Sequence, residues 1–325
     1  MDIQHIVNTS GGEASWFTAE CVAEEHGTAR LRLLFADVFI EDADLYRFLI
    51  ESSAHVFGIK RPRKIQQLCT KALNIPPLKE IQLRKWALRE LARETMKVIP
   101  GLVWIAEGRT PWEVFRDVRF LGNSRVDPCS KILKRDFLWR YIETNFNKSN
   151  AVIYFGLDAN EEHRLMSVWA RVNAEWVFLN ILSYTLLTES LLFFAPRERP
   201  LWKVSSPLID RFIFKEQIRG EAEKRGIRLS ESYALGMSHD NCSGLCVKAG
   251  HASWKTTLLK RPEAYAYAES EEQSVMALIE RDDVGVLRDR TGGSTTPITL
   301  SAFRERVEQG AQVDLYDLGG CGCAV

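Results

Sequence analysis

The stretch that most constrains the fold of this chain runs from residue 6 to residue 15. A short apolar run leads into Ser10-Gly11-Gly12, and an amphipathic stretch from Ala14 to His26 follows. This order predicts a strand, a tight loop and a helix. Glycines let a backbone turn sharply, and the free N–H groups at a helix start carry the positive end of its dipole. The stretch therefore predicts an anion site that suits phosphate or sulfate.

Alternating strand-like and helix-like segments predict the fold class. The runs 29–38, 102–106 and 151–158 have the composition of strands, and the apolar stretch 45–57 has that of a helix. Strands and helices at this spacing predict an α/β fold, a doubly wound parallel sheet with helices on both faces. Because ligands bind at the carboxyl ends of such strands, Asp37 is expected at the same edge as Ser10. A cap or turn role is the alternative for Asp37.

Composition excludes some partners. The 325 residues include 43 basic and 43 acidic side chains, so no net charge draws the chain to nucleic acid or a membrane. The amino terminus lacks the basic and apolar segments of a secretion signal, and we expect a cytoplasmic protein. In that compartment the 7 cysteines are expected to be ligands, nucleophiles or core residues rather than disulfides.

The stretch 176–194 is apolar almost throughout. Its length approaches the ~20 residues of a membrane span. Asn180 and Glu189 lie inside it, however, and no cationic flank adjoins Trp176. We predict a buried helix and no membrane association; the functional alternative is a surface for a protein partner or a second copy of the chain.

The cysteines that could act as metal ligands or nucleophiles form three groups. Cys129 lies at a predicted helix start with Lys131 and Lys134 in the following turns, which predicts an electropositive thiol site. Two further cysteine pairs, Cys242/Cys246 and Cys321/Cys323, lie in glycine-containing stretches. Glycines free the backbone to wrap around a metal or a cluster, so these pairs predict a thiolate-held metal.

Several of these motifs together resemble a known superfamily. The order Ser10-Gly11-Gly12-x-x-Ser15 resembles the pyrophosphate loop (PP-loop) of the adenine nucleotide alpha-hydrolases, which include PAPS reductases, N-type ATP pyrophosphatases and tRNA and DNA thiolation enzymes. Similar segments to that superfamily are 35–38, the Cys-Ser-x-x-Leu-Lys motif at 129–134, and the strand at 151–158 with Arg164 after it. The resemblance is strongest to PAPS-reductase-like proteins, which phages and mobile elements often encode.

The resemblance implies a nucleotide site. An adenine nucleotide, either ATP or a sulfonucleotide (APS or PAPS), is expected to place its acidic group on the loop. The residues implied as contacts are Ser10, Gly11, Gly12, Ser15, Asp37, Lys131, Lys134 and Arg164. Mg²⁺ is implied beside the phosphates, although Glu13 and Ala14 stand where ATP-using members often carry Lys-Asp.

The resemblance also implies roles for the cysteines. A [4Fe-4S] cluster would be held by Cys129, Cys242 and Cys246 with a tail thiol, Cys321 or Cys323, as fourth ligand; the other tail thiol would be the nucleophile or sulfur carrier. The alternative is a structural zinc on Cys242, Cys246 and the two tail cysteines. The chain departs from the reductase pattern in the spacing between residues 242 and 246 and in its tail motif.

Three functions follow as expectations. In the first, ATP is split at the α-phosphate to adenylate an acceptor, such as a nucleic acid, which then receives sulfur. In the second, a tail thiolate attacks the sulfur of APS or PAPS. In the third, the chain is a nucleotide-sensing or scaffold subunit that docks through 176–194. We expect residues 1–215 to form the PP-loop nucleotide-binding α/β domain and residues 216–325 to form a cysteine-rich C-terminal region.

Overall fold

The structure is a computed structural model that describes residues 2–60, 63–73, 80–173, 201–237, 240–289, 295–311, 317 and 319. The apolar stretch 176–194 and the tail cysteines Cys321 and Cys323 lie outside the described residues. Predictions for these segments therefore stay predictions. Within the described residues, no helix is long and apolar enough to cross a membrane.

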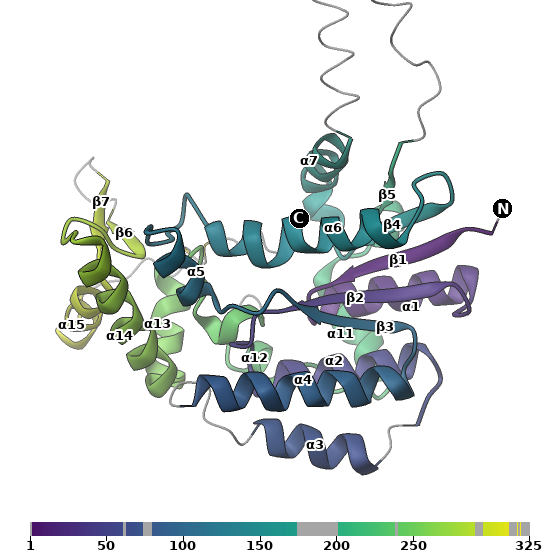
Figure 1. Cartoon of the computed structure of the whole chain (residues 1–325), viewed down its shortest axis with the longest axis horizontal. Coiled ribbons are helices and arrows are strands. Elements are labelled where there is room, and N and C mark those ends of the chain that lie inside the picture. The colour runs from purple at the N-terminus through teal and green to yellow at the C-terminus, as the bar shows by residue number, and fades with distance from the viewer. Residues whose placement is uncertain are drawn as a thin grey trace, which may run out of the picture.

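A five-stranded parallel sheet forms the centre of the molecule (Figure 1). Its strands are β1 (Gln4–Thr9), β2 (Leu31–Asp37), β3 (Leu102–Ala106), β4 (Ala151–Phe155) and β5 (Lys203–Ser205). They lie in the order β3-β2-β1-β4-β5, so the direction of winding reverses between β1 and β4. The parallel sheet confirms the predicted α/β class. β5, with three residues, is too short to show the alternation that would predict it.

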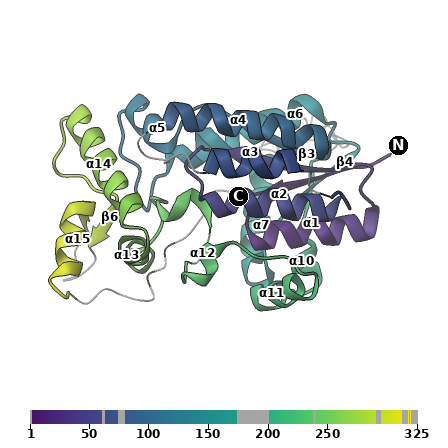
Figure 2. The same cartoon turned by 90° about the horizontal axis from the view of Figure 1, so that it is seen from below.

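Helices cover both faces of this sheet (Figures 1 and 2). The first face carries α1 (Glu13–His26), α2 (Ala43–Val56), α4 (Ile81–Val98), α10 (Pro207–Asp210) and α11 (Lys215–Lys224), and α3 (Arg63–Leu73) packs on α4. The second face carries α6 (Asp136–Asn145) and α7 (Glu162–Val172). Alternate residues of β1 enter the two cores, with Val7 in the first and Ile6 in the second. The helices predicted at 14–26 and 45–57 correspond to α1 and α2 and are confirmed.

A separate hydrophobic core lies at one end of the molecule, where α5 (Pro111–Asp117) meets the C-terminal third of the chain (Figure 1). Trp112 and Phe115 of α5 pack there with C-terminal side chains such as Trp254 and Phe303. The C-terminal elements are α13 (His251–Lys260), α14 (Pro262–Ile279), the antiparallel pair β6 (Leu287–Asp289) and β7 (Thr296–Ile298), and α15 (Leu300–Glu308). The chain following β3 therefore shares a core with residues more than a hundred positions later.

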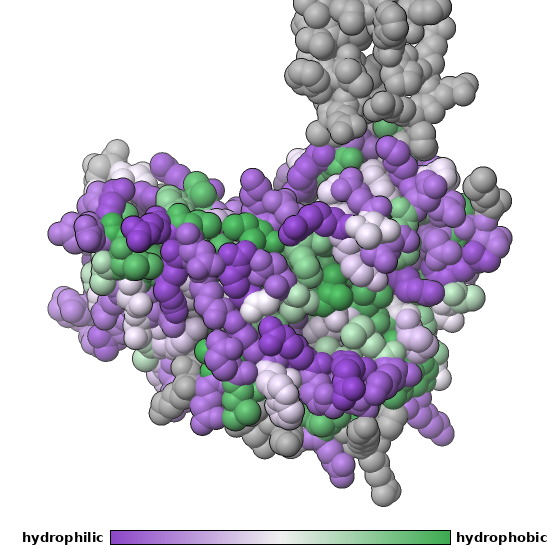
Figure 3. Space-filling view, viewed as in Figure 1, coloured by the Kyte–Doolittle hydropathy of each residue, from purple (hydrophilic) through white to green (hydrophobic). Residues whose placement is uncertain are grey.

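The link from α5 to α6 contains η1 (Ser130–Arg135), a π-helical segment that continues directly into α6. Three short elements complete the described chain: η2 (Ala159–Glu161), α12 (Glu231–Ala234) and η3 (Asn241–Gly244). Figure 3 shows hydrophobic side chains gathered between α6 and α4, over the edge strand β3, with hydrophilic side chains around them.

The loop after β4 meets the start of α1 at Gly156. A Cβ added to Gly156 would lie 2.5 Å from the backbone nitrogen of Ser15 and 2.6 Å from its Cα. Only a residue without a side chain permits this close approach. Gly156 therefore brings the loops of β1 and β4 together at the point where the strand order reverses.

We predict that Gly156→Ala destabilises the fold by about 1–3 kcal/mol, because the added methyl group pushes against backbone rather than a flexible side chain. The matched control is Gly220→Ala on α11, where the added Cβ has open space. The control is expected to stabilise the protein by about 0.5–1 kcal/mol, as alanine does in a helix interior. Urea unfolding of both variants measures the difference, and equal stabilities would contradict the close packing.

Candidate functional site

The Ser10-Gly11-Gly12 loop lies at the carboxyl end of β1, beside the reversal of strand order. Gly11 has a φ of +80°, and a Cβ added there would lie 2.8 Å from Leu45 of α2. Gly12 is the N-cap of α1. Thr9 and Ser15 join their hydroxyls across the loop at 3.0 Å, and the Ser15 hydroxyl also donates to the Gly12 carbonyl at 2.9 Å. The predicted strand, loop and helix are thus confirmed, and the loop is held rigid by its own hydroxyls.

Three side chains gather at the start of α1. The Glu13 backbone N–H donates to the hydroxyl of Tyr233 at 3.4 Å, and the Glu13 carboxylate accepts from Arg219 Nε at 3.1 Å. Arg219 also lies over the Tyr233 ring. Burial raises the pKa of Tyr233 far above its usual value, so the phenol stays neutral and keeps an O–H that can donate to an anion.

Asp37 ends β2 inside the fold. Its carboxylate accepts from the Phe39 backbone N–H and the Tyr46 hydroxyl, each at 2.7 Å, and from Trp104 Nε1 at 3.0 Å. The rings of Tyr46 and Trp104 stack at 5.5 Å beside it. Burial raises the pKa of Asp37, while these hydrogen bonds act in the opposite direction. The three donors favour the alternative of a turn residue over a contact to adenosine.

Lys134, predicted as an anion contact, is buried and paired with Glu41. Its Nζ lies 3.0 Å from Glu41 Oε1, and the other carboxylate oxygen of Glu41 accepts from the Cys242 backbone N–H. Glu41 is fully buried. Burial raises the Glu41 pKa, and the charge of Lys134 opposes that rise. Lys131 is exposed one turn earlier, so it is the lysine of this segment that a ligand can reach.

Arg164, another predicted anion contact, lies in the first turns of α7. Its guanidinium pairs with Glu161, whose own carboxylate also accepts from the Asp158 backbone N–H at 3.3 Å. Asp158 in turn caps η2. Arg164 therefore belongs to the network that shapes the loop after β4.

The structure brings two of the predicted cysteine ligands into one cluster. Cys129 and Cys242 pack with Val38, Val114 and Leu133, and Cys129 also packs against the core that contains Cys246. Cys242 and the next residue, Ser243, both have positive φ, a conformation that costs energy for residues with a side chain. In the part of the chain that the structure describes, no group of three or more histidine, cysteine or acidic side chains could hold a metal ion.

Sequence reasoning missed Glu41, Gly156, Arg219 and Tyr233. The residue type and position of Gly156, directly after a predicted strand, could have indicated a close approach. Glu41 has the pattern of an ordinary acidic helix start. Arg219 and Tyr233 carry no local signal, because they meet residue 13 across about two hundred positions of sequence.

In comparisons with known proteins, no family model, no curated protein and no solved structure matches the chain. The fold and the loop define a parallel α/β protein with a glycine-containing turn at the reversal of strand order.

We predict that Lys134→Met destabilises the protein by about 3–5 kcal/mol, because it leaves the buried Glu41 carboxylate without its cation. The matched control is Lys131→Met, an exposed position in the same π-helical segment, which is expected to change stability by less than about 0.5 kcal/mol. Chemical denaturation of both variants measures this contrast. Similar losses of unfolding free energy in the two variants would show that the ion pair between Lys134 and Glu41 does not stabilise the fold.

Proposed function

We propose that the chain binds an adenine nucleotide and is a PP-loop protein of the sulfur-transferring type. The observation that carries the proposal is the Ser10-Gly11-Gly12 turn at the carboxyl end of the central strand, with the amino terminus of α1 directly behind it. In parallel α/β sheets this edge is where ligands bind, and a helix amino terminus favours phosphate.

The residues around the loop have complementary roles in this proposal. Backbone N–H groups of the loop and the Tyr233 hydroxyl would donate to phosphate oxygens. Arg219 lies about half exposed beside them and supplies positive charge. Its present partner is the Glu13 carboxylate, so a bound phosphate would share Arg219 with Glu13.

Two described residues of the C-terminal tail, Asp317 and Gly319, lie against residues 249–252. The Asp317 carbonyl accepts from the Ala252 N–H at 3.0 Å, and the Asp317 carboxylate accepts from the His251 N–H at 3.1 Å, so the tail is docked at the start of α13. Gly319 pairs with Ala249, whose N–H donates to the Cys246 carbonyl at 2.9 Å.

In the favoured reaction the acceptor attacks the α-phosphate of ATP and pyrophosphate leaves. The outer sulfur of a cysteine persulfide, loaded by a sulfur donor, then displaces AMP from the adenylated acceptor, and a second thiol breaks the S–S bond to leave the sulfur on the acceptor and a disulfide on the protein. The pairing of Gly319 with Ala249, three residues after Cys246, favours a second candidate, reduction of APS or PAPS by a tail thiolate. The described cysteines do not by themselves form a metal site. Iron-sulfur or zinc held together with the tail thiols stays a proposal.

We predict that Ser10→Ala and Gly12→Ala each weaken adenine nucleotide binding about tenfold or more. At Gly12 an added Cβ would lie 3.1 Å from the Tyr233 hydroxyl and crowd the mouth of the loop. Calorimetric titration with ATP, APS and PAPS measures the effect and ranks the substrates. Gly220→Ala is the control. Unchanged nucleotide affinity in the loop variants would contradict the assignment of this loop as the nucleotide site.

We also predict that Cys242→Ser lowers the content of bound metal in anaerobically purified protein. Cys21→Ser is the matched control, because Cys21 is a buried cysteine of α1 that packs in the core of the first face. Iron with acid-labile sulfide would identify a cluster, and zinc would identify a structural site. Metal content equal to that of the control would show that Cys242 is not a metal ligand.

A further inference from the structure

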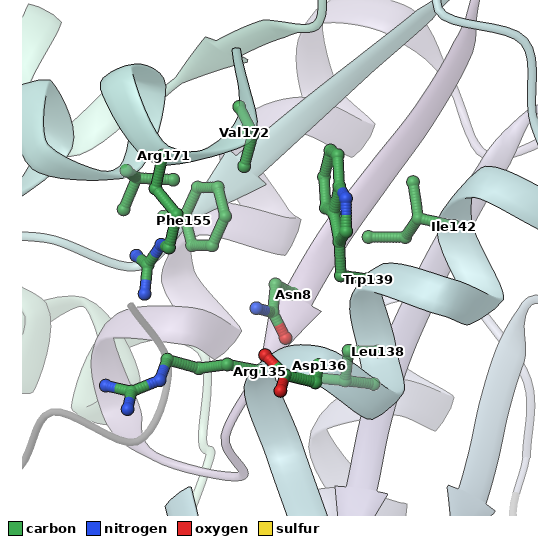
Figure 4. Close-up of a pocket in the computed structure, with 10 residues that line it drawn as sticks. Asn8, Arg135, Asp136, Leu138, Trp139, Ile142, Phe155, Arg171 and Val172 are labelled. Carbon is green, nitrogen blue, oxygen red and sulfur yellow. The ribbon is translucent and has the colours of Figure 1, made fainter. Parts of the chain in front are cut away.

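A cavity of about 120 Å³ lies on the second face of the sheet, under α6 and α7 (Figure 4). Asn8 and Phe155, which are register partners in β1 and β4, line it from the sheet. Both residues lie near the carboxyl ends of their strands. The cavity therefore lies at the reversal of strand order, which is where parallel α/β proteins bind ligands.

The floor of the cavity is apolar. Four of its lining side chains are between 1% and 6% exposed, namely Leu138, Ile142, Phe155 and Val168. Trp139 adds aromatic surface from α6. A cavity of about 150 Å³ holds benzene, so the smaller volume measured here suits a branched side chain of three or four carbon atoms.

The rim of the cavity carries charges of both signs. Arg135, which is half-buried, and the exposed Asp136 and Arg171 all line it. Figure 4 shows both guanidinium groups on one side of the cavity and the Asp136 carboxylate closer to Asn8. Partial burial lowers the pKa of Arg171, the charge of Arg135 lowers it further, and the charge of Asp136 raises it. The three charged groups therefore lie within electrostatic reach of one another.

The charged groups of the rim have no partners of their own. Among the described residues, neither guanidinium and not the Asp136 carboxylate forms an ion pair, whereas other arginines such as Arg47 and Arg116 pair with carboxylates. Two adjacent guanidinium groups suit a carboxylate, which each can bind through two N–H donors. A carboxylate beside them suits an ammonium group.

These features together define a class of ligand. It needs a short apolar part for the floor, a carboxylate for the arginines and an ammonium for Asp136. An α-amino acid with a small aliphatic side chain carries all three, with both charged groups on one carbon atom. A fatty acid or an aliphatic amine carries only one of the two charges, so it would leave part of the rim without a partner.

We propose that this cavity binds a free α-amino acid with a short aliphatic side chain, such as leucine or valine. Its carboxylate lies on Arg135 and Arg171, its ammonium on Asp136, and its side chain on the apolar floor. The inference goes beyond the proposed nucleotide site and does not rest on it, because none of the groups that it uses belongs to the glycine loop.

A series of small molecules tests the ligand class by calorimetric titration of the full-length protein. We expect saturable binding of L-leucine or L-valine. Relative to leucine, we expect at least tenfold weaker binding of 4-methylpentanoate, which lacks the ammonium, of 3-methylbutylamine, which lacks the carboxylate, and of glycine, which lacks the side chain. Equal affinities of leucine and either single-charge analogue would overturn the amino-acid class. Absence of saturable binding of both aliphatic amino acids would overturn the site.

Two charge variants with matched controls test the rim. Arg171→Gln removes a rim cation, and Arg125→Gln removes an exposed arginine outside the cavity. Asp136→Asn removes the rim carboxylate, and Glu143→Gln removes an exposed one from α6. We expect at least tenfold weaker leucine binding in the two rim variants than in their controls. In Asp136→Asn the preference for leucine over 4-methylpentanoate should also disappear, which a merely structural role of Asp136 would not cause.

A third pair of variants tests the floor. Val168→Phe fills the cavity, and the control Met166→Phe adds the same ring at a position of α7 that is 64% exposed. We expect at least tenfold weaker leucine binding in Val168→Phe. Far-ultraviolet circular dichroism shows whether it folds, and if it does not, the rim variants decide alone. Leucine affinities equal to those of the controls would overturn the site.

The same titrations separate this inference from the proposed nucleotide site. Gly12→Ala is expected to weaken nucleotide binding and to leave leucine affinity unchanged, because the glycine loop does not line the cavity. Loss of leucine binding in Gly12→Ala to the level of Arg171→Gln would contradict the cavity as an independent site. Nucleotide binding without leucine binding would overturn the cavity alone.

Discussion

The buried ion pair between Glu41 and Lys134 is the interaction on which the rest of the structure depends. It joins the loop after β2 to η1, and the same carboxylate accepts from the Cys242 N–H in η3. Three segments about a hundred residues apart in sequence thus meet at one side chain. Because a lone buried charge costs several kcal/mol, each partner requires the others. Arg84 secures the same loop from α4 by donating to the carbonyls of Phe39 and Glu41.

This arrangement positions the site. The loop after β2 leads into α2, and Leu45 of α2 packs against Gly11, where only a hydrogen fits. Gly156 presses the loop after β4 against α1 from the other side. The glycine turn is thereby held between two neighbours, so its backbone is already ordered by the fold.

The residues selected from the sequence fall into two groups: those that lie where the pattern predicted, and those whose side chains are buried against partners inside the fold. The loop residues Ser10 to Ser15 are where the pattern predicted, because strand, turn and helix are local features. Asp37 and Lys134 had the expected residue types, yet both side chains point into the fold and meet partners there. Arg219, which pairs with Glu13 beside the loop, has the local pattern of an ordinary helix-surface arginine. Local periodicity reports which segments are helices, and it says nothing about which charges will be neutralised.

The sequence alone determined the α/β class, the strand-loop-helix unit at the amino terminus and the bounds of α1 and α2 within a few residues, since these follow from the spacing of apolar residues and from glycine. Only the tertiary structure decided the order β3-β2-β1-β4-β5, the shared core of α5 with residues 245–303, and the pairing of Glu41 with Lys134. These features depend on contacts between segments far apart in the chain. The burial that gives such contacts their energy exists only once the sheet has assembled.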